Sequence, residues 1–95
     1  MATTVDELTV SYEEDGVLVT EELDKVILSK GAWATVLFKY HSWDKTKGAY
    51  GPTAFTIRRY KKMGGEYKQQ SKFTISSEDQ ARKIIDALAG WIGAK

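Results

Sequence analysis

Two runs of alternating apolar and polar residues flank a Gly-Gly pair at positions 64–65, and this pattern constrains the fold more than any other feature of the chain. Successive side chains of a strand point to opposite faces, so each run carries one apolar pair on one face. A two-residue turn would put the two apolar pairs on opposite faces, whereas a three-residue loop beginning at Met63 brings them together. The sequence therefore predicts a hairpin of residues 53–62 and 66–75 with that longer loop. The apolar pairs are Phe55 with Ile57, and Phe73 with Ile75.

Two further strands and a C-terminal helix complete the predicted fold. Residues 33–43 are rich in β-branched and aromatic side chains, and the short apolar run 26–28 ends at a Lys-Gly turn. Residues 44–52 form a polar loop that holds the only proline. Ser77 and Gln80 have capping-box spacing, and Gly93 is a typical helix stop. The apolar stripe of the helix consists of Ala81, Ile84, Ile85, Leu88, Trp91 and Ile92.

These elements predict an α+β fold of order ββββα, in which a curved antiparallel four-stranded sheet is covered on one face by the C-terminal amphipathic helix. Trp91 is then part of the core. Residues 8–12 and 17–20 are candidates for extra N-terminal strands around a turn at 13–16. A mobile acidic tail is the alternative interpretation of the same residues, since termini order only when they are tied down.

The charges of the chain are divided sharply near Lys25. Residues 1–24 hold eight acids and no base, a net charge of −8, and residues 25–95 hold 14 bases and five acids, a net charge of +9. The whole-chain value of +1 hides this division. We therefore predict an acidic arm over residues 1–24 and a domain over residues 25–95 that meets a polyanion.

Composition excludes several classes of function. The chain has no cysteine and one histidine, His41, which leaves no disulfide framework, no thiolate zinc site and no evident catalytic set. We predict no metal, no cofactor and no enzymatic activity. No apolar run approaches the ~20 residues of a membrane helix, and the N-terminus lacks signal-peptide features. A soluble cytoplasmic protein is expected, with no membrane partner.

The second face of the predicted hairpin is basic and contains no carboxylate. Residues 39–72 carry nine bases and two acids, a net charge of +7. Unpaired cations at this density favour a polyanionic ligand through counterion release. The alternative is a solvated strand face whose lysines discourage aggregation. The polar face consists of Thr56, Arg58, Tyr60 and Lys62 beside Lys68, Gln70, Lys72 and Thr74.

Aromatic side chains interspersed with these cations favour unpaired bases, on which they can stack. Trp43 opens the polar loop and is the stronger stacking candidate, whereas Trp33 and Trp43 are each also candidates for core or dimer contacts. His41 is expected to be a surface or stacking residue. The remaining candidate site residues are Lys39, Lys45 and Lys47.

The second hairpin and the helix resemble the positive-cofactor-four transcriptional coactivator family, over about residues 25–92. The motifs that carry the resemblance are Ile57-Arg58-Arg59-Tyr60, Gly65-Glu66-Tyr67-Lys68 and Ser71-Lys72-Phe73-Thr74-Ile75-Ser76, followed by a capped helix. The resemblance implies a homodimer that, like the related whirly domains, holds single-stranded DNA in transcription, replication or repair, near the nucleoid. Its implied DNA-facing residues are Arg58, Tyr60, Lys68 and Lys72. The chain departs from the family at Lys68-Gln69-Gln70, which replaces a Lys-Pro-Gly segment.

Two other functions remain open at this point. The acidic arm and basic sheet of a protein-interaction module would bind separate protein partners, or the arm would occupy the basic face and regulate access. A single-stranded RNA binder is equally compatible with stacking and cations, which do not read the 2′-hydroxyl by themselves.

Overall fold

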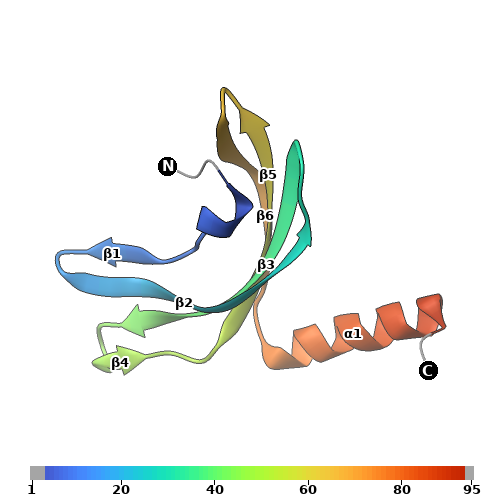
Figure 1. The fold of residues 1–95 in the computed structure, drawn as a ribbon. Helices are drawn as coiled ribbons and strands as arrows, with labels where there is room; N and C mark the ends of the chain where they lie inside the picture. Colours follow the sequence, from blue (N-terminus) through green and yellow to red (C-terminus); the bar gives the residue numbers. More distant parts are fainter. Residues whose placement is uncertain (1–3, 94–95) are drawn as a thin grey trace.

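The structure, a computed structural model, describes residues 4–93 as a curled antiparallel sheet with one C-terminal helix (Figure 1). The six-stranded sheet has the order β1-β2-β3-β5-β6, and β4 pairs with β3. The α+β class is confirmed, and the predicted count of four strands is too low. The strands are β1 (Tyr12–Glu14), β2 (Val17–Ser29), β3 (Trp33–Asp44), β4 (Ala49–Tyr50), β5 (Ala54–Met63) and β6 (Glu66–Ile75).

The acidic N-terminal residues are largely incorporated in the sheet. β1 and β2 form a hairpin around Asp15 and Gly16, which have φ values of 52° and 80°. β2 runs without interruption from residue 17 to residue 29, so the predicted boundary at Lys25 falls inside a strand. Of the other N-terminal strand candidate, residues 8–12, only Tyr12 lies in a strand. The alternating pattern of residues 17–20 therefore marks the start of a long strand that also contains the apolar run 26–28.

The β5–β6 hairpin has its four apolar side chains on one face, as predicted, but not through the predicted loop. Met63 pairs with Glu66 across a two-residue Gly64-Gly65 turn with φ values of 60° and 84°, so the predicted three-residue loop is wrong. The register then shifts between Arg59 and Tyr60, because β6 carries one extra residue opposite them. With this bulge, Phe55 pairs with Ile75 and Ile57 pairs with Phe73, so the four apolar side chains share one face, as predicted.

One face of the sheet, here called the inner face, is covered by the N-terminal segment. The face carries Val36 and Phe38 of β3, both with no exposed surface. Residues 4–10, which include the 3₁₀ helix η1 (Val5–Glu7), lie across it within the curve of the sheet (Figure 1). Val5, Leu8 and Val10 are all buried there. Burial of three such side chains stabilises the fold by ~1.5–3 kcal/mol each, so this segment is part of the core.

The opposite face, here called the outer face, carries Leu37, Phe55, Ile57 and Phe73, and the helix does not cover it. α1 (Glu78–Ile92) begins at the Ser77 N-cap, whose hydroxyl accepts from the Gln80 N–H, and ends at Gly93 in the left-handed conformation. These boundaries confirm the sequence prediction. Ser77 itself is extended (φ −154°, ψ 162°), and α1 extends away from the sheet (Figure 1). The expected packing of the helix on the apolar face is therefore wrong, and Trp91 is 82% exposed rather than in the core.

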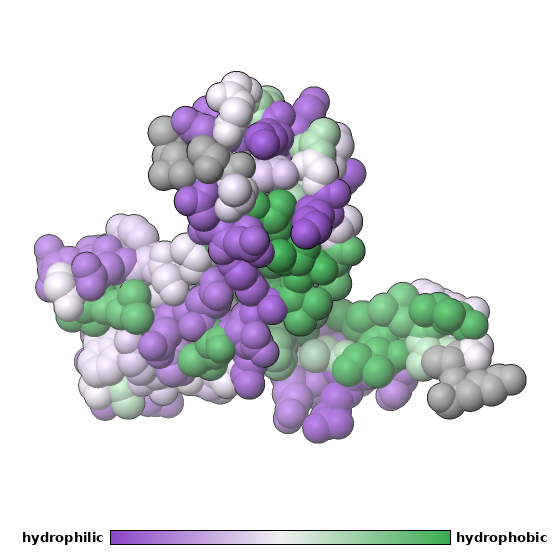
Figure 2. All heavy atoms as spheres, in the orientation of Figure 1, coloured by the Kyte–Doolittle hydropathy of each residue, from purple (hydrophilic) through white to green (hydrophobic). Residues whose placement is uncertain are grey.

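Apolar residues gather on the part of the sheet next to α1 and along the helix itself (Figure 2). The exposed large side chains of these two surfaces include Val26 and Phe73 on the strands, and Ile85, Leu88, Trp91 and Ile92 on the helix. We call these residues the apolar corner. No helix within residues 4–93 has the length and apolar character needed to cross a membrane.

Candidate nucleic-acid interface

The hairpin of β5 and β6, residues 54–75, is the most basic part of the sheet, and we call it the cationic ribbon. It holds six cations and one acid, Glu66, so its net charge is +5. The pairing of β3, β5 and β6 assigns each cation to a face, because residues directly opposite each other point to the same side. The cations are Arg58, Lys62 and Lys72 on the inner face, and Arg59, Lys61 and Lys68 on the outer face.

The predicted single basic face is therefore divided. Arg58, Tyr60, Lys62 and Lys72 share the inner face as expected, but Lys68 lies opposite Lys61 and belongs to the outer face. The bulge is the reason, because the extra residue reverses the alternation along β6 between the turn and Ser71. Gln70 is the residue without a cross-strand partner, and its side-chain amide donates to the Lys68 carbonyl.

The inner-face residues have limited freedom to meet a ligand. Tyr60 is only 5% exposed and is part of the core cluster. Burial raises the pKa of Tyr60 above the usual tyrosine value, against the lowering effect of the Arg58 charge. Arg58 is half-buried and donates from Nη1 to the Gln69 carboxamide oxygen at 3.0 Å, while its Nε is buried with no hydrogen-bond partner. Tyr60 therefore cannot stack on a base without disruption of the core.

A groove of about 470 Å³ lies between this inner surface and the N-terminal segment. Arg58, Tyr60, Tyr67 and Gln69 line one side, and residues 7–9 line the other. Glu7 thus brings a carboxylate into the same groove as Arg58, which makes the groove less favourable for a phosphate than the charge of the ribbon alone would indicate. On the same face, the Lys62 ammonium lies 5.6 Å from the centre of the Tyr67 ring.

The outer face of the ribbon carries a more open cluster. Trp33, Lys61 and Lys68 stand in one cross-strand row over β3, β5 and β6. The Arg59 guanidinium carbon lies 4.3 Å from the centre of the Trp33 ring, and the Lys61 ammonium lies 5.3 Å from it. Trp33 is 40% exposed, and all three cations are exposed. We call Trp33, Arg59, Lys61 and Lys68 the Trp33 cluster.

Three ion pairs are found among residues 4–93, and all three lie outside the ribbon. Among the described residues, the ion pairs are His41 with Glu21, and two i,i+4 pairs on α1, Arg82–Glu78 and Lys83–Asp79. Within residues 4–93, none of the six ribbon cations lies within ion-pair distance of a carboxylate. Like charges at this density repel one another, and an anionic ligand would relieve that repulsion.

The other predicted site residues lie toward the far end of β3, near acids. Lys39 stands opposite Asp24, and Trp43 and Lys45 line a pocket with Glu14 and Asp15. Lys47 follows in the turn before β4, where Asp44 accepts hydrogen bonds from the Thr46 hydroxyl and N–H. These bonds lower the pKa of the Asp44 carboxyl. Lys39 pairs with Phe55 at the end of the ribbon opposite its Gly-Gly turn, whereas the structure does not bring Trp43, Lys45 and Lys47 together with the ribbon.

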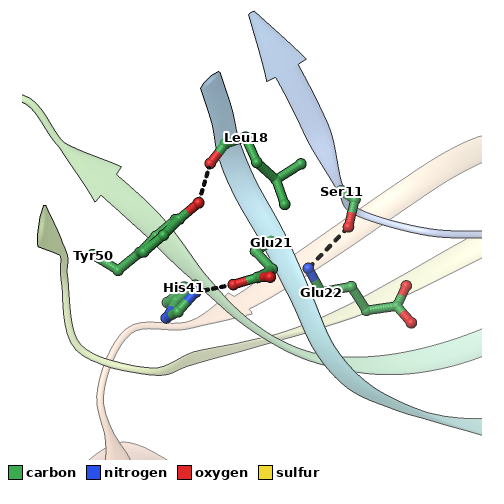
Figure 3. Close-up of polar contacts among 6 residues, drawn as sticks. All are labelled: Ser11, Leu18, Glu21, Glu22, His41 and Tyr50. Carbon is green, nitrogen blue, oxygen red and sulfur yellow. Dashed lines mark hydrogen bonds and ion pairs between the residues drawn. The ribbon is translucent and has the colours of Figure 1, made fainter. Parts of the chain in front are cut away.

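His41 belongs to a polar and aromatic cluster at the same end of the sheet (Figure 3). Its Nε2 lies 2.6 Å from the Glu21 carboxylate, and its ring stacks on Tyr50 with ring centres 3.9 Å apart. The Tyr50 hydroxyl donates to the Leu18 carbonyl, and Trp43 packs edge-on against the Tyr50 ring. The Ser11 hydroxyl accepts from the Glu22 N–H, which ties the N-terminal segment to β2. This cluster joins β2, β3 and β4, and its aromatic rings are already occupied by one another.

Sequence reasoning missed the Trp33 cluster, although its signal was present. Ile57, Arg59 and Lys61 occupy every second position of β5 and so share one face, and Trp33 starts β3. The sequence does not show the register of β3 with β5, which puts Trp33 opposite Lys61. No strand alternation fixes the pairing of two strands separated by a loop with unknown structure.

Comparison with known proteins gives no assignment: no family model, no curated protein and no solved structure matches this chain.

Proposed function

We propose that this protein binds single-stranded nucleic acid, without catalysis and with little sequence preference, through the cationic ribbon. The observation that supports the proposal best is the set of six ribbon cations with no ion-pair partner in residues 4–93, two of which lie beside the ring of the exposed Trp33. Phosphates would replace the missing counter-charges, and release of condensed ions would supply much of the affinity. Aromatic stacking would favour unpaired bases over a duplex.

DNA is the proposed ligand because the motifs of the ribbon resemble those of a coactivator family that holds single-stranded DNA. On that basis we place the protein in transcription, replication or repair, in the cytoplasm near the nucleoid. RNA shares the phosphates and the stacking surfaces, and the ribbon offers no obvious reader of the 2′-hydroxyl. The choice between the two is therefore an outcome of the binding experiment.

That experiment is a fluorescence-anisotropy competition with single-stranded DNA, single-stranded RNA and duplex DNA of equal length. We expect the single-stranded DNA to bind at least ten times more tightly than the duplex. Preference for RNA would change the proposed ligand while keeping the site. Equal or stronger binding to the duplex would contradict the proposal.

The idea that the acidic N-terminus acts as a displaceable arm receives little support. To free the inner face, residues 4–10 would have to withdraw three buried side chains, at a cost of ~1.5–3 kcal/mol each. The Lys25 ammonium also donates to the Asp6 and Leu8 carbonyls at 2.6 and 2.7 Å. A role of the acidic β1–β2 hairpin in contacting a separate protein remains compatible with its exposed carboxylates.

We also propose that the protein is a homodimer in which a second copy covers the apolar corner. Trp91 is 82% and Ile92 77% exposed, and the strand face beside the helix is apolar as well (Figure 2). Phe73 and Trp91 can bury ~150–250 Å² each. With the four aliphatic residues of the corner, the surface offered is on the order of the ~800 Å² per partner of a standard interface. Across a two-fold axis, the apolar helix stripe of each chain can pack on the apolar sheet face of the other.

Sedimentation equilibrium tests this assembly. Ile85→Lys should convert the dimer to a monomer, whereas Asp86→Lys, on the opposite side of the same helix, should leave it intact. A wild-type protein that is monomeric at tens of micromolar, or two variants that behave alike, would contradict the proposed interface.

A further inference from the structure

The Trp33 cluster has the composition of a site for a nucleotide unit, with a flat aromatic surface beside several cations. Trp33 presents an indole that is 40% exposed, and Arg59 and Lys61 lie 4.3 and 5.3 Å from its ring centre. Lys68 extends the row across β6, the edge strand of the sheet. An indole alone would fit many apolar ligands, but three adjacent cations select one that is also anionic.

The position of Trp33 is fixed by its surroundings on both sides. The ladder between β3 and β5 pairs Trp33 with Lys61, and the Lys62 N–H donates to the Ala32 carbonyl at 2.8 Å. The Tyr67 hydroxyl donates to the Gly31 carbonyl in the preceding turn, where Gly31 has a φ of 138° that favours glycine. The indole is therefore held on strand backbone rather than on a mobile loop, which reduces the entropy lost on binding.

Comparison with the other aromatic residues favours Trp33 as the stacking surface. Trp43 already packs edge-on against Tyr50, and Tyr50 is stacked on His41. Tyr60 is buried in the core cluster. Among the described residues of the ribbon and its neighbour β3, Trp33 thus combines exposure with adjacent cations and no aromatic partner.

We propose that Trp33 stacks on one unpaired base of the bound strand, and that Arg59, Lys61 and Lys68 contact the phosphates on either side of it. This inference rests on the proposed nucleic-acid binding and names the ligand group at the site. The base takes the place of the Arg59 guanidinium on the indole, because an exposed cation–π contact is weaker than base stacking. The released guanidinium then pairs with a neighbouring phosphate, which it can contact through two parallel hydrogen bonds.

The proposal can be tested through the fluorescence of Trp33. The variant Trp43→Phe/Trp91→Phe leaves Trp33 as the only one of the three tryptophans. Titration with a thymine oligonucleotide should quench this emission with the same midpoint as the anisotropy signal. An oligonucleotide with abasic sites throughout should still bind, but with little quenching.

Affinity measurements complete the test. Trp33→Ala should weaken binding of the thymine oligonucleotide by about 5- to 150-fold, the range that corresponds to loss of one stacked base. Trp33→Tyr should restore most of the affinity, Trp43→Ala should change little, and the loss caused by Trp33→Ala should disappear with the abasic strand. The abasic comparison and the tyrosine variant separate stacking from a general effect on folding.

The outcomes distinguish this inference from the proposed function on which it rests. Tight binding by anisotropy with unquenched Trp33, or an equal loss for intact and abasic strands, would overturn the stacking site and leave nucleic-acid binding in place. No detectable binding of either strand would overturn both.

Discussion

The sheet has an acidic half around β1 and β2 and a cationic half, the ribbon of β5 and β6. The two halves differ in whether their charged residues have partners within the protein. In the acidic half, Lys25 and His41 hold the segments together through contacts with backbone and carboxylate groups. In the cationic ribbon, the charges have no such partners in the described part of the chain. The two halves are also separated, because β1 and β6 are opposite edges of the sheet. Four strand spacings of ~4.8 Å exceed the ~8 Å Debye length at physiological salt, so the acids of β1 interact weakly with the cations of β6. Glu7 of the N-terminal segment, by contrast, lines the same groove as Arg58.

This difference teaches that net charge is a poor guide to what such a chain binds. The total of +1 describes neither half. The acidic half contributes to folding through its buried apolar residues, whereas the outer-face cations of the ribbon, Arg59, Lys61 and Lys68, are exposed.

The largest expected effect tests whether the acidic N-terminal segment belongs to the core. Leu8 is 5% exposed, so Leu8→Ala should lower the free energy of unfolding by ~2–5 kcal/mol through lost burial and a residual cavity. The matched control is Leu23→Ala on β2, where the side chain is exposed and the cost should be below ~1 kcal/mol. Urea denaturation measures both, and equal costs would show that residues 4–10 do not cover the core.

The second-largest expected effect tests whether the position of a cation, rather than the total charge of the chain, controls DNA binding. Lys61→Glu/Lys68→Glu should weaken single-stranded DNA binding on the order of 100-fold, because two phosphate contacts become repulsions. Lys45→Glu/Lys47→Glu changes the net charge by the same amount at the acidic end and should cost only a few-fold. If the two double variants lose equal affinity, total charge rather than the ribbon controls binding, and the contrast between the halves fails.

A smaller effect follows from neutralising the acidic edge. Glu13→Gln/Glu14→Gln on β1 should strengthen DNA binding no more than about three-fold at low salt, and the gain should vanish at physiological salt because of screening. Anisotropy at the two salt concentrations provides the measurement. A gain that persists at physiological salt would mean that the acidic edge directly competes for the ribbon.

The smallest effect is a pH dependence of stability that arises from Tyr60. Its pKa in the folded state is raised above the ordinary value of 10.0, mainly by burial. The stability that neutral Tyr60 contributes is therefore fully present below about pH 10 and is lost as the pH rises through the folded pKa. Tyr60→Phe should flatten the decline of the denaturation midpoint between pH 9 and 11, and Tyr12→Phe at an exposed position should not. Identical pH profiles for all three proteins would contradict this effect.

The sequence predicted the elements better than their arrangement. The alternation of apolar residues gave residues 66–75 as a strand with its observed ends, and the capping signals gave the bounds of the helix. The placement of the four apolar side chains of β5 and β6 on one face was also correct. Each of these features depends on local chemistry or on a single pair of neighbouring strands.

The bulge, the helix direction and the Trp33 cluster could not be predicted for related reasons. Residues 68–72 form a polar run in which no apolar side chain marks the face, so an extra residue leaves no trace in the pattern. The direction of α1 depends on the extended conformation of Ser77, which the capping signal does not specify. The row of Trp33, Lys61 and Lys68 depends on the register of β3 with β5 and of β5 with β6. Long-range placement, rather than local structure, was therefore the missing information.

The most direct test of the central claim is the salt dependence of single-stranded DNA binding. With three to six phosphates at the ribbon, the logarithm of the association constant should fall with the logarithm of salt concentration with a slope of about −2 to −4, from ~0.7 per phosphate. Lys61→Glu/Lys68→Glu should reduce that slope by at least about 1.4, and Lys45→Glu/Lys47→Glu should leave it unchanged. A slope near zero, or equal slopes for the wild type and the ribbon variant, would contradict the claim that the unpaired cations of β5 and β6 hold the ligand.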